Sequence, residues 1–424
     1  MEDSVAATVG VELDKVDLHK IDLGVPELWR AGPPLDVFAR LRRECPVHWS
    51  DLADEPNEPG FWSVTRAKDI GAVARDWETF SSERAGMLLY DDWGLPLEMV
   101  RQQLTGMDPP RHDTMRALFQ NAFTPRKIAG YAEHVRTVIK ERFDEIDGRE
   151  RIDLVADLGK TIPPTIIGDL LGAPREAVRK LVEMTERALG TFVHKDGNRG
   201  RDNKGMEEAI AQVAVYVAEL VPERRKNPKN DMTSVLIHAE VGGCRLDVED
   251  LVIFWAQVMV AGNDSTRAVY SSGMHALLQD REQFEWLQAN PSHIKTAVEE
   301  MIRCFPAFSH FRRTASRDVE LHGQRIKEND KVVLWLVSGC YDEELNDNPM
   351  RFDVRRSKVE HPAFNQGVHF CLGNALARME LQFWVEETLR RYPQMTLDGV
   401  PQRPVSTWLN QYTSVPVRLG PRAE

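Results

Sequence analysis

Cys371 is the residue of this 424-residue chain whose surroundings most clearly suggest chemistry. It lies in the run FNQGVHFCLGNALARME, residues 364–380, between Gly367 and Gly373. Glycines let a backbone approach a flat ligand closely, and the helical pattern after the cysteine places it at a helix N-terminus. The dipole there favours the thiolate, a strong metal ligand when kept from water. The run therefore predicts a metal site, although a lone cysteine is more often a buried bystander.

Polar residues in the middle of a long apolar helix form a second candidate site. The helix is predicted to begin after the N-cap Asp247 and to be apolar on all sides over 251–261. Residues 262–266, Gly-Asn-Asp-Ser-Thr, then follow within the same helix. Burying such groups unpaired costs roughly 1–3 kcal/mol each. Either the helix reaches the surface there, or these groups serve a ligand.

The order and spacing of these motifs resemble the cytochromes P450 from about residue 35 onward. In the haem-ligand loop of that family the cysteine is the protein ligand of the iron, and the matching residues here are Phe364, Gly367, His369, Cys371 and Gly373. The resemblance implies haem b, iron protoporphyrin IX, as the cofactor and Cys371 as its metal ligand. It also implies that Phe364, His369 and Gly373 contact the cofactor.

Two basic side chains one helical turn apart carry the next match. His112 and Arg116 are four residues apart, so on a helix they share a face and can clamp a carboxylate. In the family their counterparts bind a haem propionate, and Arg313 and His369 match two further propionate contacts. Solvated surface charge is the alternative explanation of these residues.

Residues 261–265 resemble the oxygen-binding groove of the family, where Ala261 borders the cofactor. The resemblance implies that Asp264 and Ser265 are catalytic, an acid and an alcohol that deliver protons during oxygen activation. Glycine lets a helix open, and a hydroxyl bonded to the backbone can hold the gap. Serine stands where threonine is usual, and it lacks the methyl group that fixes the rotamer, so the coupling of electrons to product is in question. A helix cap or a simple kink is the alternative.

Three residues are expected to brace the haem loop without acting in catalysis. Glu300 and Arg303 are three apart on a predicted helix, and Arg351 is the expected third member of a buried group. Such pairs are by themselves common solvated bridges, so only the resemblance implies their burial. Asn365 replaces a glycine that is common in the loop, and asparagine tolerates a positive φ.

The residues that the resemblance places around the substrate are largely apolar, which favours a lipophilic small molecule. They are Met87, Leu88, Phe192, Gln257, Val260, Ala261, Ala307, Phe308 and Leu409. The amide of Gln257 either binds a hydroxyl or carbonyl of the substrate or is satisfied internally, and both readings stay open. The stretches HFCLGNALARMEL and KVVLWLVSG are similar to those of soluble bacterial enzymes that hydroxylate alkanes, terpenoids and sterol side chains.

Charge and cysteine content exclude several classes of protein. A net charge of −12 does not attract nucleic acid or an anionic membrane. The five cysteines are scattered without a CxxC pair, which argues against a disulfide framework and against zinc or iron–sulfur sites. No apolar stretch is long enough to span a bilayer, and we expect a cytoplasmic protein.

Periodicity predicts a mainly α fold with a small β part, in keeping with the cytochrome P450 fold. Residues 1–25 are expected to form a loosely held arm, and residues 26–424 a single helix-rich haem domain with short β-sheets. Helices are expected over 34–43, 127–146, 165–171, 175–190, 204–226 and about thirty residues from 247. Strands are expected over 46–49, 61–64, 319–321, 324–326, 331–337, 395–397 and 415–419.

The resemblance implies a monooxygenase that hydroxylates its substrate with O2. Electrons would come from a separate ferredoxin or flavodoxin with its reductase, docked on basic residues of a monomer such as Arg355, Arg356 and Lys358. Ordinary solubilising charge is the alternative explanation of these residues. Two further functions stay open, a peroxygenase driven by H2O2 and a thiolate-haem sensor or carrier without turnover.

Overall fold

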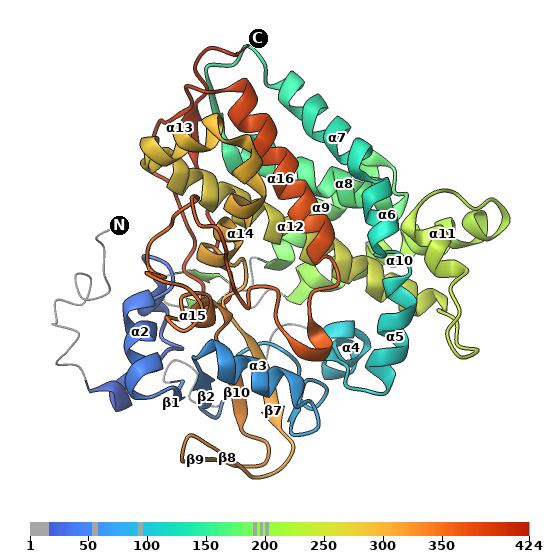
Figure 1. Ribbon diagram of the computed structural model, residues 1–424. Helices are drawn as coiled ribbons and strands as arrows, with labels where there is room; N and C mark the ends of the chain where they lie inside the picture. Colours follow the sequence, from blue (N-terminus) through green and yellow to red (C-terminus); the bar gives the residue numbers. More distant parts are fainter. Residues whose placement is uncertain are drawn as a thin grey trace.

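Helices make up most of the described chain (Figure 1). The computed structural model describes residues 17–52, 58–91, 96–189, 193–195, 198–199 and 203–423. The α-helices are α2 (Leu35–Glu44), α3 (Ala67–Arg75), α4 (Leu97–Gln102), α5 (Arg111–Gln120), α6 (Pro125–Gly130), α7 (Ala132–Glu145), α8 (Ile162–Leu171), α9 (Arg175–Leu189), α10 (Asn203–Lys226), α11 (Met232–Ile237), α12 (Val248–Gln279), α13 (Arg281–Ala289), α14 (Ile294–Cys304), α15 (Leu336–Cys340) and α16 (Asn374–Arg391). Shorter helical turns are η2 (Leu18–Lys20), η3 (Pro26–Trp29), η4 (Leu104–Gly106), η5 (Leu154–Gly159), η7 (Pro291–His293) and η8 (Gly367–His369).

The strands form small sheets, of which the largest lies with α2 and α3 at one end of the molecule (Figure 1). They are β1 (Val47–Ser50), β2 (Phe61–Val64), β3 (Phe80–Ser81), β4 (Arg151–Asp153), β5 (His194–Lys195), β6 (Asn198–Arg199), β7 (Phe311–Ala315), β8 (Val319–Leu321), β9 (Gln324–Ile326), β10 (Lys331–Leu334), β11 (Thr396–Leu397) and β12 (Pro416–Arg418). The five-stranded sheet has the order β1-β2-β10-β7-β3, and a second sheet has the order β11-β12-β4. The predicted hairpin is confirmed, because Val319 pairs with Ile326 across β8 and β9.

The longest helix, α12, crosses the centre of the molecule and packs against α8, α10, α14 and α16. It begins as the sequence predicts, because Asp250 N donates to Asp247 Oδ1 at 2.8 Å and Asp247 N donates to Asp250 Oδ2 at 3.1 Å. This reciprocal cap satisfies backbone N–H groups that the first turn leaves without partners. Residues 251–255 are buried, as an apolar helix at the protein centre requires.

Two predicted elements differ in extent from the structure: one helix is divided, and one strand is shorter. The helix expected over 127–146 divides at Tyr131 into α6 and α7, although its apolar residues are buried as predicted. The strand expected over 331–337 stops at Leu334, because Trp335 leaves the extended conformation and α15 follows. The small apolar run that suggested a longer strand is buried in either conformation, so its pattern does not separate the two.

The expected arm is shorter than 1–25, because residues 17–25 pack against the first sheet. Leu23 is fully buried, and its backbone N–H donates to Ser50 Oγ at 3.2 Å. His48 Nε2 lies 2.7 Å from the carbonyl oxygen of Ile21. The prediction for residues 1–16 lies outside the described part of the chain.

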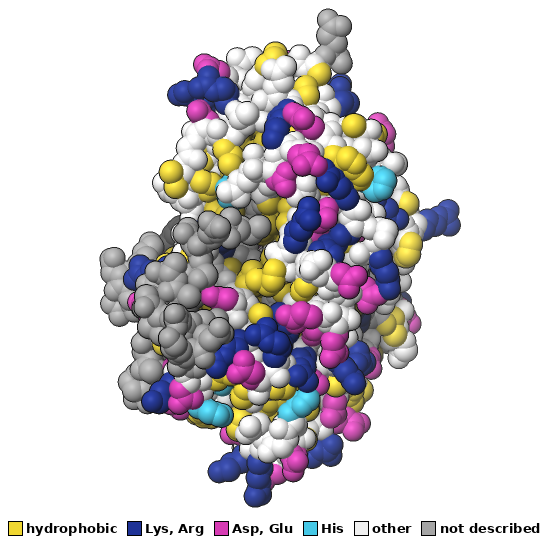
Figure 2. All heavy atoms as spheres, turned by 60° about the vertical axis from the view of Figure 1, so that its left-hand side comes forward, with side chains coloured by type: hydrophobic (Ala, Val, Ile, Leu, Met, Phe, Trp, Pro, Cys, Tyr) yellow, Lys and Arg dark blue, Asp and Glu magenta, His cyan; other side chains and the backbone are white. Residues whose placement is uncertain are grey.

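The surface mixes acidic and basic side chains, and on the face in Figure 2 hydrophobic side chains gather in a hollow near the middle. In the part of the chain that the structure describes, no helix combines the length and apolarity needed to cross a bilayer.

Candidate active site

A loop held by backbone hydrogen bonds presents Cys371 before α16. Cys371 N donates to the Phe364 carbonyl oxygen at 2.9 Å, and Asn374 Nδ2 donates to the Cys371 carbonyl oxygen at 2.7 Å. Asn365 has φ 61° and Gly367 has φ 67°, so the loop needs two left-handed residues. A Cβ on Gly367 would lie 2.2 Å from the Ala74 carbonyl oxygen, which explains glycine there. The tolerance of Asn365 for this conformation agrees with the expectation.

Burial dominates the electrostatics of the Cys371 thiol. It raises the pKa of the thiol, while the Gly373 N–H and the guanidinium groups of Arg116 and Arg378 lower it. The N–H groups at the helix start thus favour the thiolate as expected, but in the free side chain burial outweighs them. A metal that binds this sulfur would displace its proton.

Four cationic or donor side chains from three distant segments gather beside this loop. The rings of His112 and His369 are 4.7 Å apart, and burial lowers the pKa of His369 well below its usual range, with Arg313 and Arg116 lowering it further. Arg116 Nη2 donates to the Phe370 carbonyl oxygen at 2.8 Å. The structure thus brings together the four predicted propionate-binding residues.

This cluster fits the dianionic edge of a haem. His112 is fully buried, and its Nε2 has no hydrogen-bond partner. Arg313 is 2% exposed, its Nη2 also lacks a partner, and burial lowers its pKa to about 10. Buried donors of this kind are normally satisfied, so an anion is needed between them. The cofactor that the resemblance implies supplies two carboxylates for that position.

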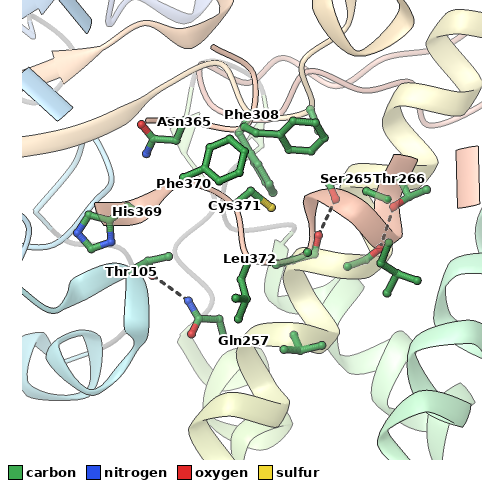
Figure 3. Close-up of a pocket in the computed structure, with 18 of the residues that line it drawn as sticks. Thr105, Gln257, Ser265, Thr266, Phe308, Asn365, His369, Phe370, Cys371 and Leu372 are labelled. Carbon is green, nitrogen blue, oxygen red and sulfur yellow. Dashed lines mark hydrogen bonds between the residues drawn. The ribbon is translucent and has the colours of Figure 1, made fainter. Parts of the chain in front are cut away.

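A cavity of about 250 Å³ lies between this loop and α12 (Figure 3). The predicted residues that line it are Met87, Arg116, Gln257, Ala261, Ser265, Ala307, Phe308, Arg313, Phe364, His369, Cys371 and Gly373. Residues that the sequence analysis did not propose also line it, among them Leu104, Thr105, Phe254, Val258, Thr266 and Glu380. They come from turns and helix faces whose orientation toward the cavity is set only by the fold.

Three residues predicted for the substrate pocket lie outside this lining. Leu88 and Leu409 form a buried cluster with Val100 and Trp408, against which Val260 packs. This cluster borders the cavity, because Met87 and Phe308 both line the cavity and pack against the cluster, and the role of these three residues stays a prediction. Phe192 lies outside the described residues.

Gln257 uses its amide to hold the 104–105 segment against α12. Leu104 N donates to Gln257 Oε1 at 3.2 Å, and Gln257 Nε2 donates to Thr105 Oγ1 at 3.0 Å (Figure 3). Of the two readings of this side chain, the structure favours the internally satisfied amide.

Helix α12 runs without interruption through residues 261–266, contrary to the expected opening. Ser265 Oγ donates to the Ala261 carbonyl oxygen at 2.6 Å, and Thr266 Oγ1 donates to the Gly262 carbonyl oxygen at 3.3 Å. Hydroxyls that return to the preceding turn weaken the helix locally without breaking it. Ser265 reaches the cavity in this way, whereas Asp264 is absent from its lining.

Asp264 is buried at 5% exposure and joins a chain of charges that leads to the surface. Its carboxylate pairs with Arg267, and Arg267 Nη1 donates to Glu186 Oε1 at 2.8 Å. Lys160 Nζ donates to the other carboxylate oxygen of Glu186 at 2.9 Å. Burial raises the pKa of Asp264, and Arg267 opposes that rise. The acid is thus connected to the partly exposed Glu186 on α9.

The brace behind the loop is a buried ion pair on α14 with a different third member. Arg303 donates from Nε and Nη2 to both oxygens of Glu300 at 2.7 and 2.8 Å, and neither side chain is exposed. Arg351 was wrongly predicted to join them, since its side chain is 64% exposed. Arg356 Nε instead donates to Glu300 Oε1 at 3.0 Å. The Arg351 contribution is its carbonyl oxygen, which accepts from Arg303 Nη2 at 3.2 Å.

Glu380 on α16 is a cavity-lining carboxyl that the sequence analysis missed. It is 1% exposed, and its Oε1 has no hydrogen-bond partner. Burial raises its pKa to about 8, so at neutral pH the side chain holds a proton. The sequence could have indicated this residue, because Glu380 is a glutamate on a predicted helix face that is otherwise apolar.

Replacing Glu380 with glutamine should make the free energy of unfolding less dependent on pH. The folded protein holds a proton up to about pH 8 that an unfolded glutamate, with a pKa of about 4.3, releases earlier. Stability of the unmodified holoprotein therefore falls as the pH rises from 5 to 8, by at most about 1.4 kcal/mol per pH unit. Urea unfolding at several pH values measures this slope. The control Glu386→Gln, an exposed carboxyl on the same helix, should keep it, and equal slopes in all three proteins would contradict the assignment.

Comparison with known proteins agrees with this geometry. A sequence model described as Cytochrome P450 matches residues 100–416. The chain is 32% identical to the linalool 8-monooxygenase of Pseudomonas putida, covering 96% of the chain and 100% of that enzyme, and 30% identical to the steroid C26-monooxygenase of Rhodococcus jostii, covering 92% and 82%. A Mycobacterium marinum cytochrome P450 in complex with pseudoionone superposes with a TM-score of 0.81 at 35% identity, covering 90% of this chain and 94% of that one. The chain belongs to the cytochrome P450 family and is a monooxygenase with haem iron as its cofactor.

Proposed function

We propose that the protein binds haem b and hydroxylates a lipophilic small molecule, with electrons from a ferredoxin or flavodoxin and its reductase. The observation that carries the proposal is the cavity whose lining includes both Cys371 and Ser265. A metal ligand and a proton-handling hydroxyl then serve one enclosed, mostly apolar space. Linalool, steroid and methyl-branched lipid hydroxylases among the relatives support a lipophilic substrate.

The side chains have separate tasks in this mechanism. Cys371 Sγ would ligate the iron, and His112, Arg116, Arg313 and His369 would hold the propionates. When bound, the haem iron supplies the activation of O2. Ser265 Oγ holds a proton at the cavity wall, and Asp264 is the proposed acid, whose carboxylate the Arg267 guanidinium holds in an ion pair.

Two basic side chains in the 355–358 segment, which the family resemblance places on the thiolate side, support a separate electron donor. Arg355 is 31% exposed and paired with Glu282, and Lys358 is 78% exposed and paired with Glu360, so an acidic partner would have to replace these carboxylates. Arg356, which was expected to share this role, is 14% exposed and bonded to Glu300. We propose docking on Arg355 and Lys358, on a monomer in the cytoplasm, where scattered free cysteines suit a reducing environment.

Replacing Ser265 with alanine should divert electrons from product to peroxide, lowering product per NAD(P)H by about 10-fold or more. The hydroxyl that holds the proton is lost, while the apolar wall stays. The measurement is product, H2O2 and NAD(P)H consumption with a ferredoxin and its reductase. Ser271→Ala is the matched control, since Ser271 Oγ donates to the Ala268 carbonyl oxygen on the same helix away from the cavity.

The same assay distinguishes this monooxygenase from the two other functions, a peroxygenase and a sensor or carrier without turnover. Faster turnover with H2O2 alone than with NAD(P)H would indicate a peroxygenase, and unchanged coupling in Ser265→Ala would remove Ser265 from proton delivery. Oxygen consumption that stays slow with every redox partner would indicate a sensor or carrier.

A further inference from the structure

We propose that the Thr105 hydroxyl binds an oxygen of the substrate, so that the substrate class is a lipophilic molecule with an alcohol or ketone group. The inference rests on the proposed function, because it names the substrate class for the same cavity. Thr105 lines that cavity from η4, and Figure 3 shows it and Ser265 on opposite sides of Cys371 in this view.

The hydrogen bonds of Gln257 determine whether the Thr105 hydroxyl is still free to act as a donor. The backbone N–H of Leu104 is a donor only, so the Gln257 atom that it meets must be the carbonyl oxygen Oε1. The other end of the amide is then the donor Nε2, and Thr105 Oγ1 accepts from it at 3.0 Å. A hydroxyl that accepts still has one proton to donate. Among the described residues no acceptor for that proton is found.

Glu380 on α16, with its protonated carboxyl, is a second neutral donor of the lining, and the polar groups named next are engaged in different tasks. Ser265 and Thr266 donate their hydroxyl protons to carbonyl oxygens of α12. Arg116, Arg313 and His369 belong to the cluster that fits the propionates. Thr105 is therefore a neutral donor held in place beside apolar side chains such as Met87 and Phe254.

A neutral donor in an apolar wall selects the chemical class of the acceptor. An alcohol or ketone oxygen satisfies one hydroxyl donor, whereas a carboxylate would be left with most of its charge unpaired. A hydrocarbon would leave the Thr105 proton without a partner, and a few placed polar groups are what orient ligands in apolar pockets. A substrate oxygen at Thr105 would hold the remaining carbon skeleton in the rest of the cavity.

Two ligands that differ in one hydroxyl test the inference on the holoenzyme. The probes are linalool and the hydrocarbon of the same skeleton, 3,7-dimethylocta-1,6-diene, titrated by their difference spectra. Thr105→Val removes the hydroxyl and keeps the shape, so Kd for linalool should rise about 10-fold while Kd for the hydrocarbon changes by less than about 2-fold. Thr105→Ser keeps the hydroxyl and should leave the linalool-to-hydrocarbon ratio as in the unmodified enzyme.

Gln257→Met separates binding by Thr105 from the tether that positions it. This variant keeps the Thr105 hydroxyl but removes its tether, so Kd for linalool should rise by less than in Thr105→Val. A linalool-specific rise larger in Gln257→Met than in Thr105→Val would assign the donor to the second hydrogen of Gln257 Nε2 and overturn the proposal, as would equal effects of Thr105→Val on both ligands. If neither probe binds the unmodified holoenzyme, the proposed substrate class itself fails.

Discussion

Replacing Cys371 with alanine should abolish the strongly red-shifted Soret band of the reduced CO complex and reduce hydroxylation by at least about 1,000-fold. The reason is that Cys371 is the proposed metal ligand in the loop that faces the cavity, while the donors around it would hold the carboxylates of the cofactor. Absorbance spectra of the reduced protein under CO, with turnover in the same preparation, measure both effects.

A control with another thiol makes this result specific. Cys244 is exposed and remote in sequence from the loop, so Cys244→Ala should keep both the band and the activity. Circular dichroism of the Cys371→Ala protein distinguishes loss of the ligand from loss of the fold. A red-shifted band that survives in a folded Cys371→Ala protein would show that Cys371 is not the metal ligand.

Replacing Arg303 with methionine should lower the free energy of unfolding by about 3–5 kcal/mol. The change leaves the carboxylate of Glu300 buried with one remaining ionic partner, Arg356, and it also removes hydrogen bonds to backbone carbonyls. A loss of this size is a large part of the 5–15 kcal/mol typical of a protein domain, so haem retention should suffer as well. Urea unfolding followed by circular dichroism gives the difference.

Two further variants test whether Arg351 contributes to the Glu300–Arg303 group through its backbone alone. Arg351→Ala should change the free energy of unfolding by less than about 0.5 kcal/mol, since only its backbone takes part. The Glu300→Gln, Arg303→Met double variant should recover part of the loss, because no unpaired charge remains. An Arg351→Ala protein as unstable as Arg303→Met would restore the original prediction.

Features that depend only on residues close together in the sequence could be predicted from it. The cap of α12 depends on Asp247 and Asp250 alone, and the left-handed loop position depends on what Asn365 itself tolerates. The mainly α fold follows from helical periodicity and is observed. The gathering of His112, Arg313 and His369 was also foreseen, because spacing and order matched a known loop.

Contacts made by irregular segments were beyond such reasoning. Arg351 and Arg356 lie five residues apart in a segment without regular structure, where no period says which side chain turns inward. The partner of Gln257 lies 152 residues earlier in the chain, so its amide gave no local sign of a tether. Glu380 belongs to a helix face whose burial depends on packing against other helices.

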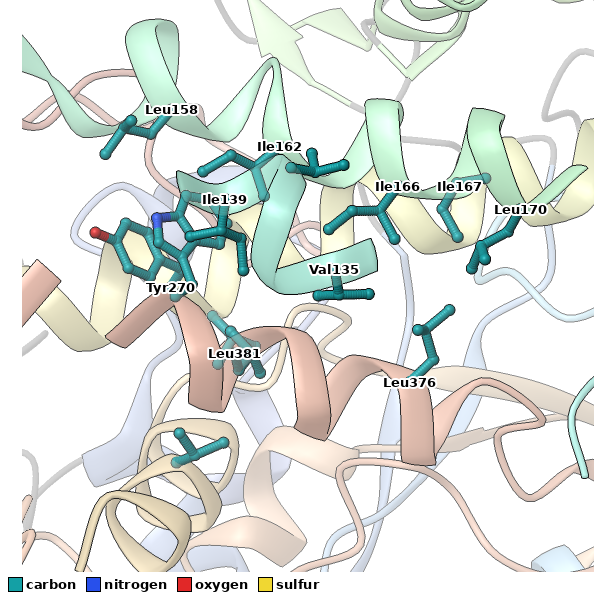
Figure 4. Close-up of a cluster of buried hydrophobic side chains, with 14 of the residues drawn as sticks. Val135, Ile139, Leu158, Ile162, Ile166, Ile167, Leu170, Tyr270, Leu376 and Leu381 are labelled. Atoms are coloured by element: carbon teal, nitrogen blue, oxygen red, sulfur yellow. The ribbon is translucent and has the colours of Figure 1, made fainter. Parts of the chain in front are cut away.

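The stacking of Tyr270 on Trp384 acts as a spacer between the two walls of the active site. Their rings are 3.6 Å apart and nearly parallel, and Figure 4 shows Tyr270 among the buried side chains between α12 and α16. Ser265 precedes Tyr270 on α12, and Cys371 precedes α16. Because packed rings resist compression, this core contact limits how closely α12, which carries Ser265, can approach α16, which follows Cys371.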